Sequence, residues 1–403
     1  MKARAFCLRV ALSLVLVALL AGAVCADWAS VSIGGGSMKR TLMDVDSDGY
    51  VDSLTVNYWY KNPGTGAGSW QAISTGWNQE IWNGGYQVGH AKIATFIDGQ
   101  RVGDVNGDGL PDMVIGTMGW DSAAGVPTNM RDSIYVAINP GTQGTWSFYY
   151  IGTLTPATED GVEAIEIGDM NNDGYPDIIA GGENHQVRWY VNPGTMSNNW
   201  SYYTLYTNTY CDIEGMALTD FNSDGYLDIA ATSCASLGGS GATFVLLNPK
   251  SNTGNWPCYT LDTSIYSCME TISVGDLDGD GDMDVIVGIR KPFVKSYLSW
   301  YKNKSNGTSW SSRILMDTLS TIGLEGQLPV VVDVNLDGYN DVICYRKDSA
   351  ASYWYKNNGS GSSWIKNQIT ANSLGSYYAV GDVDNDGDID IICGGRWYKN
   401  PTN

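Results

Sequence analysis

The chain has 403 residues, a formal net charge of −20 at pH 7, and many glycine and aromatic residues, with 49 Gly, 25 Tyr and 15 Trp. A negative charge of this size disfavours nucleic acids and anionic membranes as partners, because both would repel the protein. The abundance of glycine, tyrosine and tryptophan favours a turn-rich, all-β protein.

Residues 1–26 are predicted to be a secretory signal peptide. Three basic residues precede or begin an apolar segment from Val10 to Ala23, and small residues typical of a cleavage site follow it. No later segment of the sequence is apolar enough to span a bilayer. We therefore expect residues 27–403 to form one secreted or extracellular domain, with the periplasm or a cell surface as alternative locations.

An acidic turn recurs seven times in residues 27–403. The clearest copy is Asp276-Leu277-Asp278-Gly279-Asp280-Gly281-Asp282-Met283-Asp284, whose first, third, fifth and ninth residues are aspartates around a glycine bend. Ca²⁺ favours such turns because it takes about six to eight oxygen ligands from carboxylates and carbonyls. The turn begins like an EF-hand loop, but Val287 stands where that loop has its bidentate glutamate, so an EF-hand is excluded.

The predicted calcium ligands share the spacing of this copy, and a glycine directly follows the third ligand in every turn. They are Asp44, Asp46, Asp48 and Asp52; Asp104, Asn106, Asp108 and Asp112; Asp169, Asn171, Asp173 and Asp177; Asp220, Asn222, Asp224 and Asp228; Asp276, Asp278, Asp280 and Asp284; Asp333, Asn335, Asp337 and Asp341; and Asp382, Asp384, Asp386 and Asp390. We expect up to seven Ca²⁺ ions with a structural role, because ligands from one chain saturate each ion and its binding stabilises the fold.

A second motif follows each acidic turn, as in Trp189-Tyr190-Val191-Asn192-Pro193-Gly194, and a further strand comes after it. Each repeat thus offers four short strands. Repeats of this content, with first ligands 49 to 65 residues apart, predict a seven-bladed β-propeller with four-stranded blades. The chain stops after a third strand at Arg396–Lys399, so we expect the strand at Asp27–Ile33 to complete the last blade and close the ring.

These aspartate turns resemble the FG-GAP and VCBS repeat family, which includes the calcium-binding, integrin-like propellers. The resemblance covers essentially all of residues 27–403, although the Phe-Gly and Gly-Ala-Pro words that named the repeat are not evident. It implies an extracellular propeller that is stabilised by Ca²⁺ at the blade hairpins. Family members include adhesion receptors, a fungal lectin and some polysaccharide lyases, so the fold alone does not decide the function.

Acidic residues also recur six positions before the first predicted calcium ligand. Asp98, Glu163, Glu214 and Glu270 occupy this position in repeats two to five, and Glu325 fits it in repeat six if two residues are inserted. Because the first strand of each blade lines the central channel, we expect these carboxylates near one mouth of it. They are either solvated strand ends or a site for a cation or for sugar hydroxyls, and the sequence leaves both interpretations open.

The two longest segments between acidic turns carry additional aromatic residues. Trp82 and His90 lie in the first segment and Trp120 lies in the second. Aromatic rings that pack on the apolar face of a sugar, beside carboxylates that bind its hydroxyls, are typical of carbohydrate sites. Packing of the loops onto the blades explains the same tryptophans equally well.

The sequence lacks a nucleophile elbow, a Ser/His/Asp arrangement and a zinc motif. We therefore expect a secreted, calcium-stabilised, lectin-like binding module for carbohydrate or an extracellular protein, rather than an enzyme. Two alternatives remain. One is a polysaccharide lyase or glycoside hydrolase with its site at the channel mouth, and the other is a purely structural or adhesive repeat protein.

Six cysteines lie in residues 27–403, and their spacing dictates no pairing. Cys344 and Cys393 follow acidic turns on equivalent strands, and we expect them to be core side chains rather than a bridge. The better disulfide candidates are Cys258 with Cys268, or Cys211 with Cys268.

Overall fold

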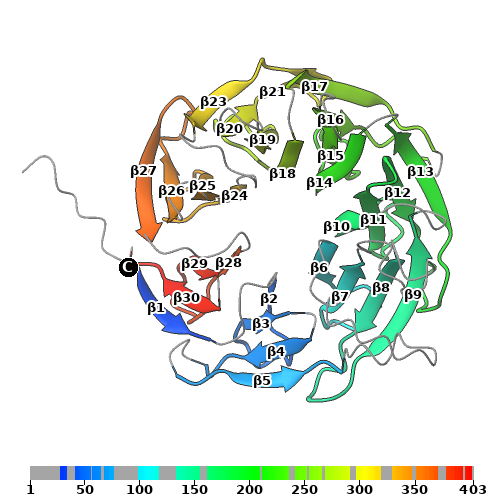
Figure 1. Cartoon of the computed structure of the whole chain (residues 1–403), viewed down its shortest axis with the longest axis vertical. Coiled ribbons are helices and arrows are strands. Elements are labelled where there is room, and N and C mark those ends of the chain that lie inside the picture. Colours follow the sequence, from blue (N-terminus) through cyan, green and yellow to red (C-terminus); the bar gives the residue numbers. More distant parts are fainter. Residues whose placement is uncertain are drawn as a thin grey trace, which may run out of the picture.

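The computed structural model describes residues 28–33, 41–55, 57–64, 68–76, 99–117, 133–154, 161–208, 211–235, 241–251, 254–265, 268–290, 296–318, 329–346, 351–370, 378–393 and 395–401. Within these ranges every regular element is a β-strand, and no helix is present that could cross a membrane. The strands form seven four-stranded antiparallel sheets arranged around a common axis (Figure 1). The predicted seven-bladed β-propeller is thus confirmed.

The four strands of each blade follow one another from the inner to the outer edge of the ring. Blade 1 is β2 (Thr41–Met43), β3 (Asp52–Leu54), β4 (Tyr58–Lys61) and β5 (Gln71–Ser74), and blade 2 is β6 (Gly99–Gly103), β7 (Asp112–Gly116), β8 (Ser133–Ile138) and β9 (Ser147–Thr153). Blade 3 is β10 (Val162–Gly168), β11 (Asp177–Gly182), β12 (Gln186–Tyr190) and β13 (Tyr202–Thr207), and blade 4 is β14 (Cys211–Thr219), β15 (Asp228–Ala235), β16 (Gly241–Leu246) and β17 (Cys258–Ile265).

Blade 5 is β18 (Cys268–Gly275), β19 (Asp284–Arg290), β20 (Ser296–Tyr301) and β23 (Ile314–Thr318), with an extra hairpin of β21 (Asn303–Ser305) and β22 (Ser309–Trp310). Blade 6 is β24 (Pro329–Val332), β25 (Asp341–Arg346), β26 (Ala351–Asn357) and β27 (Trp364–Thr370). Blade 7 is β28 (Tyr378–Gly381), β29 (Asp390–Cys393), β30 (Arg396–Lys399) and β1 (Ala29–Ser32).

The last blade takes its outer strand from the other end of the chain, as expected. Strand β1 pairs antiparallel with β30, and the two lie side by side in Figure 1 in blue and red. Trp28 and Ile33, which flank β1, are both buried. The Arg396 side chain donates a hydrogen bond of 2.8 Å to the Ser30 hydroxyl oxygen. This pairing gives the final sheet its fourth strand and closes the ring without a covalent link.

The hydrophobic core lies between the blades. Strands β7, β11 and β29 are buried at every residue, because neighbouring blades cover both faces of each sheet. One core cluster joins Trp189 of blade 3 to Ile213 and Trp256 of blade 4, and the two tryptophan ring centroids are 6.1 Å apart. The blades therefore stabilise one another through apolar contacts around the ring.

The cysteines follow the prediction only in part. Cys344 and Cys393 are fully buried thiols outside any disulfide bond, as expected for core side chains. Both predicted disulfides are wrong, because Cys211 and Cys258 are not disulfide-bonded. Cys234 is disulfide-bonded. Spacing along the chain misleads here because pairing depends on which strand ends meet, and β15, which carries Cys234, contacts the inner strand β18 of the next blade.

Candidate metal centres and ligand site

Each acidic turn connects the inner strand of a blade to its second strand. The glycine after the third predicted ligand has a φ between +86° and +93° in all seven copies, a conformation that side chains rarely adopt. Its N–H donates to Oδ2 of the first aspartate at 2.7 to 2.9 Å in every copy. The invariant glycine thus allows the chain to wrap around the first aspartate.

The fourth aspartate of each turn is completely buried at the start of the second strand. In blade 5, Oδ2 of Asp284 accepts the N–H of Leu277 and Oδ1 accepts the N–H of Asn303, both at 2.9 Å. The other six blades repeat this pair of bonds. Burial raises the pKa of Asp284 to about 7, although the two N–H groups oppose the shift. A bound cation would favour the charged carboxylate.

The asparagine that follows the third strand links each blade to the one before it. In blade 6, Nδ2 of Asn357 donates a hydrogen bond of 2.8 Å to the backbone oxygen of Leu277 in blade 5. The remaining bonds of this kind join Asn62 to Val383, Asn139 to Val45, Asn192 to Val105, Asn248 to Met170, Asn303 to Phe221, and Asn400 to Val334, at 2.7 to 3.0 Å. One such bond therefore crosses each of the seven blade interfaces.

Sequence reasoning treated this asparagine only as a turn residue and missed its role. Its side chains are nearly inaccessible in all seven blades, with exposures of 0 to 5 %. The apolar residue after each first aspartate is buried too, and it offers its N–H to the fourth aspartate and its C=O to the neighbouring asparagine. A signal for this bond is present in the sequence, because an asparagine after the third strand and an apolar residue after the first aspartate recur in every repeat.

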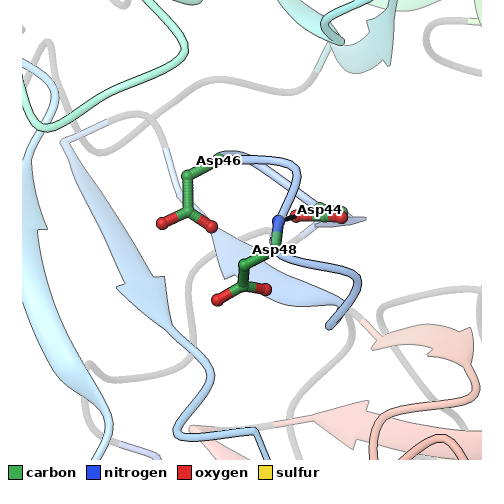
Figure 2. Close-up of side chains that lie close together, drawn as sticks. All are labelled: Asp44, Asp46 and Asp48. Atoms are coloured by element: carbon green, nitrogen blue, oxygen red, sulfur yellow. Dashed lines mark hydrogen bonds between the residues drawn. The ribbon is translucent and has the colours of Figure 1, made fainter.

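Three of the turns bring three aspartate side chains close together. In blades 1, 5 and 7, three aspartate oxygens lie within 4.8 Å of one another, from Asp44, Asp46 and Asp48, from Asp276, Asp278 and Asp284, and from Asp382, Asp384 and Asp390. Figure 2 shows the first of these groups on its turn. Within the described part of the chain, Oδ1 of Asp46, Asp278 and Asp384 is buried and has no hydrogen-bond donor. An all-oxygen set with an unpaired buried oxygen fits a hard cation such as Ca²⁺.

The predicted ligand-binding residues are described only in part. Trp82, His90, Asp98, Trp120 and Glu325 lie outside the described residues. Glu163 and Glu214 lie on the inner strands β10 and β14 and are partly buried, and Glu270 lies on the inner strand β18.

The three glutamates share a feature that the sequence did not reveal. The pairing of the inner strand with the second strand shifts between Val162 and Ala164, between Ile213 and Gly215, and between Met269 and Thr271. The residue in each shift is Glu163, Glu214 or Glu270. A bulge of this kind re-aims the side chain of the extra residue. The bulges lie at the end of each strand that is opposite the acidic turn.

A histidine that sequence reasoning passed over lies at the same end of blade 3. His185 occupies the turn between β11 and β12 with a φ of +63°, and its Nδ1 is 2.9 Å from Oδ1 of Asp212 on β14. The contact joins blades 3 and 4. Asp212 directly precedes Ile213, where the shift in the pairing of β14 begins. This mouth of the ring therefore combines carboxylates with an imidazole, groups that accept or donate hydrogen bonds to hydroxyls.

Comparison with known proteins establishes the family. A model for FG-GAP-like repeats matches residues 104–180, 169–231, 220–287 and 333–393, which together are more than half of the chain. The chain belongs to the FG-GAP-like repeat family. Each match begins at the first aspartate of one acidic turn and ends three residues after the last aspartate of the next. The FG-GAP-like unit therefore runs from turn to turn. No curated protein matches the chain.

Solved structures resemble this FG-GAP-like protein in fold. One is an Agrocybe aegerita lectin, described as recognising non-reducing terminal N-acetylglucosamine, with a TM-score of 0.53, 17 % identity, and coverage of 83 % of this chain and 81 % of that one. Another is BBS1N in complex with ARL6DN, soaked with lead, with a TM-score of 0.53, 9 % identity, and coverage of 92 % and 95 %. At these identities the likeness concerns the fold alone.

Proposed function

We propose that this FG-GAP-like protein is a secreted, calcium-stabilised propeller that binds carbohydrate at the mouth of the ring opposite the acidic turns. The observation that carries the proposal is the bulged glutamate on three consecutive inner strands, at Glu163, Glu214 and Glu270. On blades 3 and 4 this displacement re-aims the side chains of Glu163 and Glu214 at the end of the strands opposite the acidic turns. Carboxylates there are suited to accept hydrogen bonds from sugar hydroxyls.

Two further observations support carbohydrate as the ligand. The His185 and Asp212 pair adds polar groups between blades 3 and 4 at the same mouth. The similar fold of a lectin described as recognising N-acetylglucosamine is compatible with sugar binding by such a ring. The predicted aromatic residues Trp82 and Trp120 would supply the rings on which a sugar packs.

The calcium part of the proposal is supported by the chemistry of the turns. Their donors are carboxylate and amide oxygens, the ligands that Ca²⁺ takes, and the fourth aspartate is buried without a cationic partner among the described residues. Because the unfolded chain holds no such site, calcium binding would add to the free energy of unfolding. The ions would act by holding the hairpins in shape.

Secretion is proposed from residues 1–26, which have the features of a signal peptide. The disulfide at Cys234 agrees with an oxidising compartment, since disulfides are rare in the cytosol.

The test is retention of the calcium-loaded protein on a panel of glycans and polysaccharides, with new reducing or unsaturated ends measured in parallel. We expect retention on a glycan without new ends, and a loss of about tenfold or more in affinity for Glu163→Gln and Glu214→Gln, since each loses a charge-assisted hydrogen bond. Glu166→Gln is the matched control, because Glu166 lies on the same strand β10 and pairs with Arg101 instead. Release of new ends would show that the protein is an enzyme rather than a binding module. No retention on any glycan would point to a protein partner or an adhesive role.

A further inference from the structure

The acidic turns fall into two classes by their second ligand. It is aspartate in blades 1, 5 and 7 and asparagine in blades 2, 3, 4 and 6. The residue before the interblade asparagine changes with it. That residue is Lys61, Lys302 or Lys399 in the three aspartate blades, and Ile138, Val191, Leu247 or Lys356 in the four asparagine blades. All three aspartate blades thus carry a lysine, whereas only one asparagine blade does.

In the aspartate blades the lysine reaches the turn from the third strand or its end. Lys302 forms an ion pair with Asp278, and its Nζ is 2.7 Å from Oδ2 of Asp280. Lys61 contacts Asp46 and Asp48 in the same way, and Lys399 contacts Asp384 and Asp386. Each ammonium therefore bridges the second and third ligands.

In three of the four asparagine blades the amide makes this bridge itself. Nδ2 of Asn106 donates to Oδ2 of Asp108 at 2.9 Å, and Asn171 and Asn335 make the same bond to the third ligand at 2.9 and 3.0 Å. Oδ1 of each asparagine accepts the N–H of the third ligand. In the aspartate blades, by contrast, Oδ1 of the second ligand is buried with no donor in the described structure. The lysine holds one oxygen and leaves the other available to a cation.

In blades 2 and 3 the exchange conserves the charge of the ligand set. Four carboxylates with one lysine carry a formal charge of −3, and three carboxylates with one amide carry the same charge. Blades 4 and 6 differ, because Lys250 pairs with Asp224 at 3.3 Å and Lys356 pairs with Asp337 at 3.0 Å, so a lysine lowers the negative charge of these asparagine turns as well. The lysine of an aspartate blade therefore brings its turn to the charge of the turns in blades 2 and 3.

We propose that Lys61, Lys302 and Lys399 are built-in counter-ions of three calcium turns. They hold the second and third ligands together when calcium is absent, and they weaken calcium binding at those turns when it is present. The turns of blades 2 and 3, where no lysine ion pair is found among the described residues, depend on calcium more strongly. This inference rests on the calcium part of the proposed function and is independent of the sugar ligand.

The test is calcium titration by calorimetry, without any sugar, on the wild type and on Lys302→Met. We expect Lys302→Met to raise the affinity of one site by about tenfold, because a positive charge a few ångströms from the ion is removed. The matched control is Lys304→Met, since Lys304 is exposed two residues away. The double variant Asp278→Asn with Lys302→Val copies blade 3 and should bind calcium as the wild type does. Equal affinity of Lys302→Met and wild type would overturn the proposal.

Hydrogen exchange in chelator provides a second readout that does not depend on affinity. We expect residues 104–112 and 169–177 to exchange faster than residues 276–284 and 382–390, and Lys302→Met to move 276–284 into the faster group. Equal exchange in all these turns would overturn the proposal. A wild type that binds no calcium at millimolar concentration would overturn it together with the calcium part of the proposed function, whereas glycan retention would still test the sugar site separately.

Discussion

The side-chain amide of Asn62 donates a hydrogen bond of 2.7 Å to the backbone oxygen of Val383, which lies 321 positions later in the chain. This bond joins blade 1 to blade 7 on the side of the acidic turns. The pairing of β1 with β30 completes blade 7 at its outer edge. Two contacts therefore join the two ends of the described chain. One is the hydrogen bond of Asn62 beside the acidic turns, and the other is the pairing of β1 with β30 at the outer edge of blade 7.

We expect Asn62→Ala to lower the free energy of unfolding by about 2 kcal/mol. The substitution leaves the partly buried carbonyl of Val51 and the buried carbonyl of Val383 without the Nδ2 donor, and an unsatisfied buried polar group costs about 1–3 kcal/mol. Chemical denaturation followed by tryptophan fluorescence measures the loss. Asn367→Ala is the control, because Asn367 is only partly buried and its side chain donates a long hydrogen bond of 3.3 Å to the backbone oxygen of Ile365. Equal stability of the two variants would contradict the structural role of Asn62.

Two aspartates of one turn should respond differently to calcium removal. Asp284→Ala removes the acceptor of the Leu277 and Asn303 N–H groups, so we expect a loss of about 3 kcal/mol both in calcium and in chelator. Asp278→Asn should lower stability in calcium but change it by less than about 1 kcal/mol in chelator, because there it loses only a partly exposed ion pair. Thermal unfolding of each variant in both conditions decides this. A Tm of the wild type that is unchanged by chelator would show that the turns are not calcium sites.

The repeats predicted the blades, their number and the closure by Asp27–Ile33, because each of these follows from periodicity along the chain. The interblade bond of Asn62 could not be predicted in the same way, since its acceptor belongs to another repeat. The shifts at Glu163 and Glu214 depend on how two strands pair, and pairing register is not written in the spacing of residues. The predicted disulfides of Cys268 failed for a related reason, because they were judged by distance along the sequence.

The cysteines outside disulfide bonds should differ in reactivity. Cys258 is exposed as a residue, so we expect alkylation of the folded protein to modify it. The rate should increase with pH because the thiolate is the reactive form, and partial desolvation of the sulfur raises the pKa of Cys258 and moves this increase to higher pH. Cys344 and Cys393 have no accessible surface and should be modified only after unfolding. Mass spectrometry of peptides from native and denatured samples measures this order. Modification of Cys344 in the folded protein would contradict its position in the core.

Trp28 should be essential for the closed ring. It is buried against a cluster that includes Ile343 of blade 6 and Ile391 of blade 7, so Trp28→Ala is expected to cost about 3–5 kcal/mol. Ile365→Ala on the neighbouring outer strand β27 is the control, since Ile365 is 61 % exposed and should change stability by less than about 0.5 kcal/mol. Denaturant midpoints compare the two. A loss for Trp28→Ala no larger than that for the control would show that β1 adds little to the ring.

The bonds across the blade interfaces bear on how such a protein can evolve. Every repeat supplies an asparagine donor toward the preceding blade, and its own turn supplies an acceptor to the following blade, as Val45 does for Asn139. A gene segment that encodes one blade therefore carries both halves of the bond. Duplication or loss of such a segment would leave every donor with an acceptor, so the number of blades can change without compensating mutations at these positions.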